Sequence, residues 1–393
     1  MQLLQTFKTH VAKIDDKLIA IRQHIHSHPE LSFEEFNTAI YVKTQLQQIG
    51  ITNIATCANT GVVAIIAGNN PQQKVIALRA DMDALPITEA NDVPYKSKNN
   101  GVMHACGHDV HTTCLLGAAE LLFATKNQWS GTVKLIFQPG EEKNPGGASL
   151  MIKDGVLTNP APQKIFGLHV HPQMEVGTFS FRGGVVMAST DELYITLNGK
   201  GGHAAAPHIT TDIIVVAAQI ITGLQQIVSR NNNPFNPTVL SITSIHGGTT
   251  TNVIPSQVQL KGTLRCMDEA WRKQAHALLN KYITETANTF GATATVNIDI
   301  GYPMVNNNEA LSQHAKQIAI LSHGQQAVST TELRMGAEDF AFYGELIPAC
   351  FFRLGAGNAA KGITNSVHTP VFNVDEKCIA QGALMLAWQA VNA

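Results

Sequence analysis

The sequence predicts an α/β protein built on a mainly parallel sheet, with a second, ferredoxin-like α+β domain inserted into it. Three observations support this prediction: the length, the alternation of helical and strand patterns in the first half, and a changed order of elements between residues 184 and 300. At 393 residues the chain exceeds what one hydrophobic core usually supports, so two domains are expected.

The first half of the chain alternates helical and strand patterns. Strands separated by helices imply a mainly parallel sheet covered on both faces, with functional sites at the carboxyl ends of its strands. Acidic residues and a histidine occur at those ends. The expected helices lie near residues 16–28, 34–49 and 111–126, and the expected strands at 62–67, 75–79, 132–138 and 165–170.

Residues 184–300 follow the order β-α-β-β-α-β, which is the ferredoxin-like order. A self-contained unit inside a longer α/β pattern indicates an inserted domain, so we expect the first domain to comprise residues 1–183 and 301–393 and the inserted domain residues 184–300. Gly183-Gly184 and Gly301-Tyr302-Pro303 are the expected hinges. The expected strands of the insertion lie at 192–197, 238–245, 257–265 and 293–300, and its helices at 211–230 and 268–290.

Composition narrows the class of protein. Charged residues make up 14% of the chain and the formal net charge is −2, which offers no basic field for a nucleic acid. Charged residues interrupt the N-terminal segment, and no apolar stretch approaches 18 residues, so we expect a cytoplasmic protein without a membrane partner. The six cysteines are scattered and are expected to be reduced thiols.

The densest chemical signal is the segment MHACGHDVH at residues 103–111. The Cys106 thiolate and the His108 imidazole can both bind one ion, and Gly107 between them allows a tight turn. Taken alone, the segment is equally compatible with a buried, apolar Cys106 and with histidines that cap the following helix.

A pair of adjacent carboxylates, Glu141 and Glu142, follows the strand at 132–138. Like charges in a partly dry site raise each other's pKa unless a cation lies nearby. A metal site could use one carboxylate as a ligand and the other as a base that takes a proton from water. A solvated surface pair is the alternative interpretation.

Three further positions could contribute to such a site. Asp81 and Asp83 alternate at the end of a strand, so one of them could orient a ligating histidine; turn-forming aspartates before Pro86 are the alternative. His169 ends an apolar strand, and His368 lies in a polar loop far along the chain. Either histidine alone is more often structural than a ligand.

Together these residues resemble the N-acyl-amino-acid amidohydrolase and hippurate hydrolase family. That family is similar to plant hydrolases of auxin–amino acid conjugates and, more distantly, to the zinc carboxypeptidase and aminoacylase superfamily. This sequence departs from the family's pattern at Gly140, where the resemblance leads us to expect alanine. The match runs nearly end to end, through RADMDALPI (79–87), MHACGHDVH (103–111), FQPGEE (137–142), GLHVHP (167–172), GKGGHAAAPH (199–208), TNVIP (251–255), GTLR (262–265), GAEDFAFY (336–343) and HTPVFN (368–373).

The resemblance implies a site for two divalent ions, with Glu141 as the base that activates water and Asp83 as the carboxylate behind a ligating histidine. The inserted domain would supply His203 as an oxyanion donor across a dimer, and Asn252 and Arg265 near the substrate's carboxylate. An exposed His203 and a surface Arg265 are the alternatives. The implied metal ligands are Cys106, His108, Glu142, His169 and His368.

The implied reaction is hydrolysis of the amide bond of an N-acetyl, N-benzoyl or similar amino acid to a carboxylate and a free amino acid. A thiolate with imidazoles favours zinc, with nickel, cobalt or manganese as alternatives. A dipeptidase or carboxypeptidase of the same superfamily is the second hypothesis. A non-catalytic binding relative is disfavoured because every ligand and Glu141 are present. We expect a homodimer, with a tetramer as the alternative.

Overall fold

The structure is a computed structural model that describes residues 2–393. The chain divides into two compact units. The first comprises the described residues up to Val186, together with Asn306–Glu332 and Asp339–Ala393. The second comprises Met187–Val305 and Leu333–Glu338, so a short segment after residue 332 groups with the second unit although the sequence did not indicate it.

The first unit is built on an eight-stranded mixed sheet in the order β1-β2-β4-β3-β5-β16-β6-β15. Its four central strands are parallel, whereas the β1–β2, β2–β4 and β16–β6 pairs are antiparallel. The predicted α/β class with a mostly parallel central sheet is therefore confirmed. The strands are β1 (Ile54–Cys57), β2 (Gly61–Ala67), β3 (Val75–Asp81), β4 (Thr132–Gln138), β5 (Lys164–Glu175), β6 (Phe179–Phe181), β15 (Val328–Thr330) and β16 (Ala349–Gly357).

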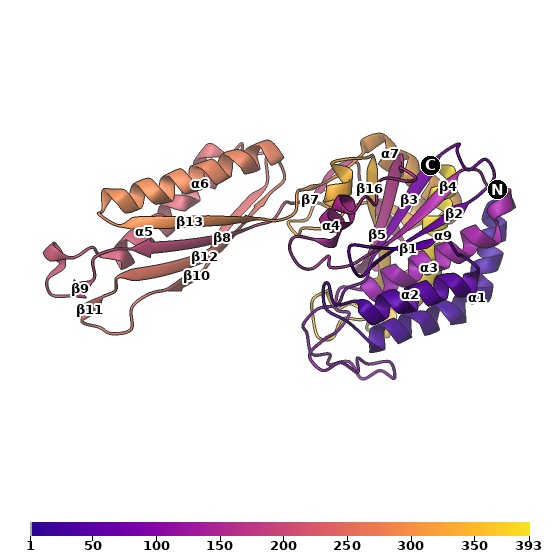
Figure 1. Ribbon diagram of the computed structural model, residues 1–393, viewed down its shortest axis with the longest axis horizontal. Coiled ribbons are helices and arrows are strands. Elements are labelled where there is room, and N and C mark those ends of the chain that lie inside the picture. The colour runs from indigo at the N-terminus through magenta and orange to yellow at the C-terminus, as the bar shows by residue number, and fades with distance from the viewer. Residues whose placement is uncertain (1) are drawn as a thin grey trace. The chain divides into compact units, whose positions relative to one another are not determined.

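Helices α1, α2 and α3 pack side by side in a layer against this sheet, and α9 packs against α1 and α3 (Figure 1). The prediction that the first helix begins near residue 16 is wrong. Leu4, Phe7, Val11 and Ile14 are all buried at helical spacing, so the helix already begins at Gln2. The helices of the unit are α1 (Gln2–Ser27), α2 (Phe36–Ile49), α3 (His108–Ala124), α4 (Gly147–Lys153), α7 (Glu309–His323), α8 (Ala341–Gly344) and α9 (Lys377–Asn392).

The register of the parallel strands brings several chain segments to one edge of the sheet. Asp81 at the end of β3 lies opposite Gln138 at the end of β4, and Arg79 lies opposite Gly167 in β5. Segments that leave these strands therefore begin close together. The loops that carry the predicted site residues emerge from this edge.

The second unit is a four-stranded antiparallel sheet in the order β10-β12-β8-β13, with α5 and α6 packed against it. Helix α5 with its last turn, Ile213–Asn231, is long and apolar enough to cross a membrane by length and composition alone; its buried face packs in the core of this unit. The elements are β8 (Asp191–Asn198), β9 (Gly202–His203), α5 (Ile213–Gln226), β10 (Thr238–His246), β11 (Val253–Ile254), β12 (Gln257–Cys266), α6 (Glu269–Thr289) and β13 (Thr293–Ile300); a separate ladder joins β7 (Gly184–Met187) to β14 (Val305–Asn307).

Candidate metal centre

The thiol of the predicted site lies in the turn that leads into α3. The helix begins at His108, three residues earlier than the sequence indicated. Gly107 adopts a left-handed φ of 88°, and a Cβ there would lie 2.4 Å from Cγ2 of Val170. Only glycine allows this turn to pack so closely on β5, and the turn aims Cys106 and His108 at the strand ends.

Two groups of ligand atoms share the Cys106 thiol. Cys106, His108 and His169 form one group, in which Sγ lies 3.4 Å from Nε2 of His169. Cys106, Glu142 and His368 form the other, in which Nε2 of His368 lies 3.1 Å from Oε1 of Glu142. Two groups that share a sulfur atom could hold two ions side by side.

Both histidines of the first group present an Nε2 lone pair. His108 donates through Nδ1 to Oδ1 of Asp83 at 3.1 Å, and His169 donates through Nδ1 to the carbonyl of Val170 at 2.7 Å. Each acceptor fixes the tautomer, so Nε2 is left unprotonated in the neutral ring. Nε2 of His108 is buried and has no hydrogen-bond partner. An orphaned, buried lone pair among thiol and imidazole donors fits a borderline metal ion such as zinc.

The two glutamates after β4 are not a solvated surface pair. Glu141 is buried, and the side chain of Glu142 is 14% exposed. Both carboxylates form a third group of candidate ligand atoms with His108. Oε1 of Glu141 also accepts a long hydrogen bond of 3.4 Å from the backbone N–H of Asp339. The structure thus brings the predicted base to the donor atoms.

Protonation equilibria in the centre reflect burial and crowding. Burial raises the pKa of the Cys106 thiol, and the Glu142 carboxylate raises it further. Hydrogen bonds to Cys106 and Glu142 raise the pKa of His368 to about 10. Burial lowers the pKa of His169 well below its usual value. Although burial lowers the pKa of His108, Asp81 and Cys106 raise it well above its usual value. A cation that binds here must displace protons from Cys106, His108 and His368, so its affinity should increase with pH.

Asp83 does more than orient one histidine. Besides Nδ1 of His108, it accepts the hydroxyl of Ser32 at 2.7 Å and the backbone N–H of Glu142 at 3.0 Å. One carboxylate therefore holds residues of two candidate ligand groups in register. Sequence spacing indicated the link to a histidine but not the contact with Ser32.

His111 and Asp81 support the centre from behind. Nδ1 of His111 donates to Oδ1 of Asp81 at 2.6 Å, and its Nε2 accepts the backbone N–H of Val170 at 2.9 Å. Both ring nitrogens are therefore occupied, so His111 cannot also bind a metal ion, although its distance from His108 would allow it. His111 therefore holds the backbone of β5 at Val170, the residue after His169, which the motif alone did not indicate.

A buried arginine connects three of the contributing segments. Arg79 donates to Asp81 at 2.7 Å, to Gln138 at 2.9 Å and to Asp339 at 2.8 Å. Asp339 also accepts the side chain of Gln138 and the N–H of Ala148. These charge-assisted hydrogen bonds hold the ends of β3 and β4 together. Arg79 and Asp339 lie in matched motifs, but their partnership could not be recognised from spacing.

The second unit contains the three remaining predicted residues, His203, Asn252 and Arg265. His203 is exposed on β9, opposite Val253, and the N–H of Ala204 donates to the carbonyl of Asn252, so His203 and Asn252 lie close together. Arg265 lies near the far end of β12, eight residues after its first residue, Gln257. At about 3.3 Å per residue, the backbone at Arg265 lies roughly 26 Å along β12 from Gln257. The short strands β9 and β11 lie at the Gln257 end of β12.

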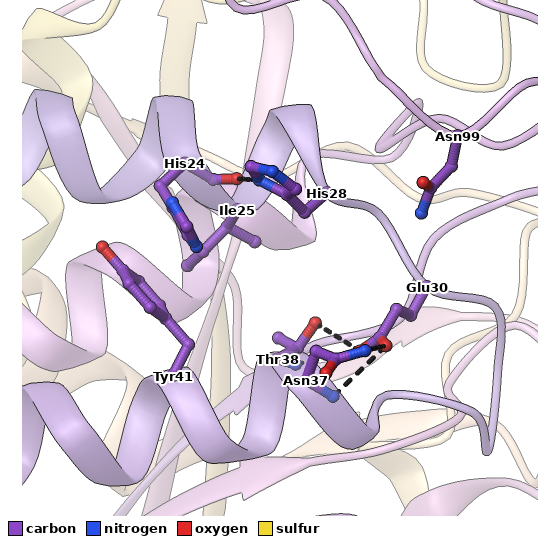
Figure 2. Close-up of a pocket in the computed structure, with 8 residues that line it drawn as sticks. All are labelled: His24, Ile25, His28, Glu30, Asn37, Thr38, Tyr41 and Asn99. Carbon is purple, nitrogen blue, oxygen red and sulfur yellow. Dashed lines mark hydrogen bonds between the residues drawn. The ribbon is translucent and has the colours of Figure 1, made fainter.

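A pocket of about 300 Å³ lies elsewhere in the first unit, between the end of α1 and the start of α2 (Figure 2). No residue of the candidate ligand groups lines it. Glu30 lines this pocket, and its carboxylate accepts hydrogen bonds from Asn37 and Thr38 and so caps the start of α2. The pocket is therefore separate from the metal centre, whose residues lie at the strand ends.

A mixed α/β sheet with buried thiol, imidazole and carboxylate donors at its strand ends is typical of hydrolases that use metal ions. Comparison of the chain with known proteins supports its assignment to metal-dependent hydrolases. Residues 77–388 match the model of peptidase family M20/M25/M40. The chain therefore belongs to this family, and it is a metal-dependent amidohydrolase.

Three similar proteins illustrate the range of the family. Thermostable carboxypeptidase 2 of Saccharolobus solfataricus is 41% identical over 100% of this chain and 99% of its own length. The N-acetyl-L-cysteine deacetylase of Bacillus subtilis is 40% identical over 96% of this chain and 88% of its own length. The crystal structure of the Bacillus subtilis YXEP protein, a dinuclear metal-binding peptidase of family M20, matches with a TM-score of 0.83 and 35% identity, over 97% and 98% of the two chains.

Proposed function

We propose that this chain removes the acyl group from N-acylated amino acids, with Glu141 as the general base. The observation that carries the proposal is the Cys106 thiol shared by two groups of ligand atoms, with the buried Glu141 carboxylate beside one of them. Cys106, His108, Glu142, His169 and His368 would hold two divalent ions, zinc before nickel, cobalt or manganese.

The proposed mechanism follows from what each side chain can do. When bound, the ions polarise the amide carbonyl and lower the pKa of water toward neutrality. Glu141 accepts a proton from the attacking water and returns it to the departing amine. Asp83 keeps a proton on Nδ1 of His108, so Nε2 stays a lone-pair donor. The products are a carboxylate and a free amino acid.

A carboxypeptidase or dipeptidase is the second candidate, favoured by the 41% identity to a carboxypeptidase over the whole chain. Both substrate classes share an amide whose amine side is an amino acid with a free carboxylate. Matched pairs such as N-acetylmethionine and alanylmethionine separate the two. We expect a higher kcat/KM for the acyl compound, and the opposite order would make the chain a peptidase.

Replacing the base provides the direct test of the mechanism. Glu141→Gln keeps the size of the side chain but removes the proton acceptor, so kcat should fall by about 10²–10⁴-fold with both metal ions retained. Prolonged chelation should abolish hydrolysis, and a zinc-group ion should restore it. Near-normal turnover of the Glu141→Gln protein, or full activity of a preparation shown to be metal-free by elemental analysis, would refute the proposal.

We also propose that the second unit acts as a lid and as the dimerisation surface. Two exposed apolar features support a second copy as the partner: Ile214 and Val215 on the outer face of α5, and Val239 and Ile245 on β10, an edge strand of the sheet. A homodimer is expected, with a tetramer as the alternative.

The separation within the second unit gives the dimer a chemical consequence. A backbone separation of roughly 26 Å along β12 is too large for Asn252 and Arg265 of one chain to contact the same substrate carboxylate, so we infer that they serve one substrate from different subunits. His203, beside Asn252, would then come from the partner as the oxyanion donor. His203→Ala should lower kcat by about 10²–10³-fold without loss of metal.

Subunit mixing tests donation across the dimer. The His203→Ala and Glu141→Gln proteins should each be nearly inactive, whereas a heterodimer of the two would contain one site with both residues intact. Activity should therefore return when subunits exchange. If labelled subunits demonstrably exchange and no activity returns, His203 acts within its own chain or not at all.

A further inference from the structure

Glu35, in the turn between α1 and α2, is a fully buried carboxylate that the mechanism above does not use. Its Oε1 accepts the backbone N–H groups of Phe33 and Gly140, each at 2.8 Å. Its Oε2 accepts the hydroxyl of Thr60 at 2.7 Å. Gly140 directly precedes the proposed base, so Glu35 is bonded to the loop that carries it.

The contact between this turn and the base loop, residues 139–142, is close. Gly140 has a left-handed φ of 54°, and a Cβ there would lie 2.2 Å from the ring of Phe33. Phe33 is itself left-handed, with φ at 70°. The alanine expected at position 140 would not fit this packing. Two unusual backbone conformations thus meet where Glu35 accepts both N–H groups.

The same turn reaches the other end of the base loop through Asp83. Ser32 donates to Oδ2 of Asp83, and the same oxygen accepts the N–H of Glu142. Residues on both sides of Glu141 are therefore tied, directly or through one carboxylate, to residues 32–35. Loops held at both ends by buried hydrogen bonds keep their side chains in a narrow range of positions.

We propose that Glu35 is a positioning residue for the general base: by holding Gly140, it sets the direction from which Glu141 approaches the reacting water. This inference rests on the proposed role of Glu141. Displacement of a catalytic group by about 1 Å can cost about 100-fold in rate. Burial and the nearby Asp83 raise the pKa of Glu35 to about 7, so its position in the fold is an expensive place for a carboxylate.

Three variants separate positioning from general stability. Glu35→Ala removes the acceptor and leaves two backbone N–H groups unpaired. Glu35→Gln keeps an oxygen for both N–H groups, and its amide can donate to Thr60. Glu30→Ala is the matched control. Glu30 caps α2, the helix that directly follows Glu35, through Asn37 and Thr38, but has no hydrogen bond to the base loop (Figure 2).

The first measurement is hydrogen exchange of residues 138–147, which depends on neither activity nor metal. Exchange should be at least about tenfold faster in the Glu35→Ala protein and unchanged in the Glu35→Gln and Glu30→Ala proteins. The second is steady-state kinetics with metal analysis. The Glu35→Ala protein should lose about 10–100-fold in kcat with KM and metal content nearly unchanged, whereas the other two should stay within about twofold.

Several results would overturn the inference. Unchanged exchange of residues 138–147 in the Glu35→Ala protein would refute it directly, as would a kcat equal to that of the Glu30→Ala protein. If Glu35→Ala does not fold, Glu35→Asp replaces it, since the shorter side chain cannot reach Gly140; equal exchange and kcat in the Asp and Gln variants would overturn the proposal. An active Glu141→Gln protein would instead refute the proposed function, whatever the exchange data show.

Discussion

Replacing Asp83 by asparagine should weaken metal binding through a change of tautomer. Oδ2 of Asp83 accepts Ser32 and the N–H of Glu142, so the carbonyl oxygen of asparagine would occupy that side. The amide NH₂ would then face Nδ1 of His108, which must become an acceptor. The proton of a neutral His108 would move to Nε2, the buried atom aimed at the metal centre.

The magnitude follows from comparable changes behind metal ligands. Loss of an outer carboxylate usually lowers metal affinity by about 10–100-fold, which corresponds to about 1.4–2.8 kcal/mol. Zinc affinity is measured by competition with a chromogenic chelator at fixed pH. Ser32→Ala is the control, because it removes one hydrogen bond to the same oxygen and leaves the charge and the His108 tautomer intact. Equal zinc affinities for the two variants would refute the tautomer argument.

Two further predictions concern stability. Asp191→Asn should lower the free energy of unfolding of the second unit by about 1–3 kcal/mol, because the buried Arg272 loses its fully buried charged partner and keeps only the partly exposed Glu269. Burial raises the pKa of Asp191, but hydrogen bonds from Arg272 and His276 outweigh burial and hold this pKa below its usual value of 3.8. The stabilisation is therefore present above about pH 4 and is lost as pH falls through the folded pKa. Urea titrations at pH 3 and 7 should show a smaller pH dependence of stability in the Asp191→Asn protein. Gly140→Ala should lower the free energy of unfolding by about 1–3 kcal/mol, and a second substitution, Phe33→Ala, should recover part of this loss. A melting temperature of the Gly140→Ala protein equal to that of the unmodified protein would contradict the packing argument.

Part of the local chemistry of the centre could be predicted from the sequence, because two of its donors lie in one short motif and its two glutamates follow a strand. Cys106 and His108 share the motif, and Glu141 and Glu142 follow β4, since parallel strands fix where the next residues emerge. The family resemblance, not the spacing, singled out Glu142 as the ligand. His169 was expected to end its strand, yet β5 continues to Glu175, so it projects from the middle of a longer strand. The prediction of His169 as a donor does not depend on where the strand ends, because side-chain direction in a strand depends on alternation and not on strand length.

The supporting residues were not predictable for a different reason. Glu35 meets Gly140 across 105 positions, and the contact needs two left-handed residues that no periodicity reveals. The motif alone does not distinguish His108 from His111 as a metal ligand. Only the occupied nitrogens of His111 decide between them. Long-range hydrogen bonds, rather than residue type, separate ligands from supports.

The centre also has to remain folded before metal arrives, because its carboxylates are buried beside one another. Arg79 compensates Asp81 and Asp339 with fixed charge. Glu142 is different: its partner His368 has its pKa raised to about 10, so below that pH a proton there supplies the positive charge. This contribution is complete below pH 6.5, the usual pKa of the imidazole, and is lost as pH rises through about 10.

A bound ion replaces that proton, which means that metal and proton compete for the same residues. The chelated protein should therefore stay folded at neutral pH. Its melting temperature should fall further below that of the metal-loaded protein as pH rises from 7 to 9. A gap that narrows over this range would show that His368 does not exchange a proton for the ion.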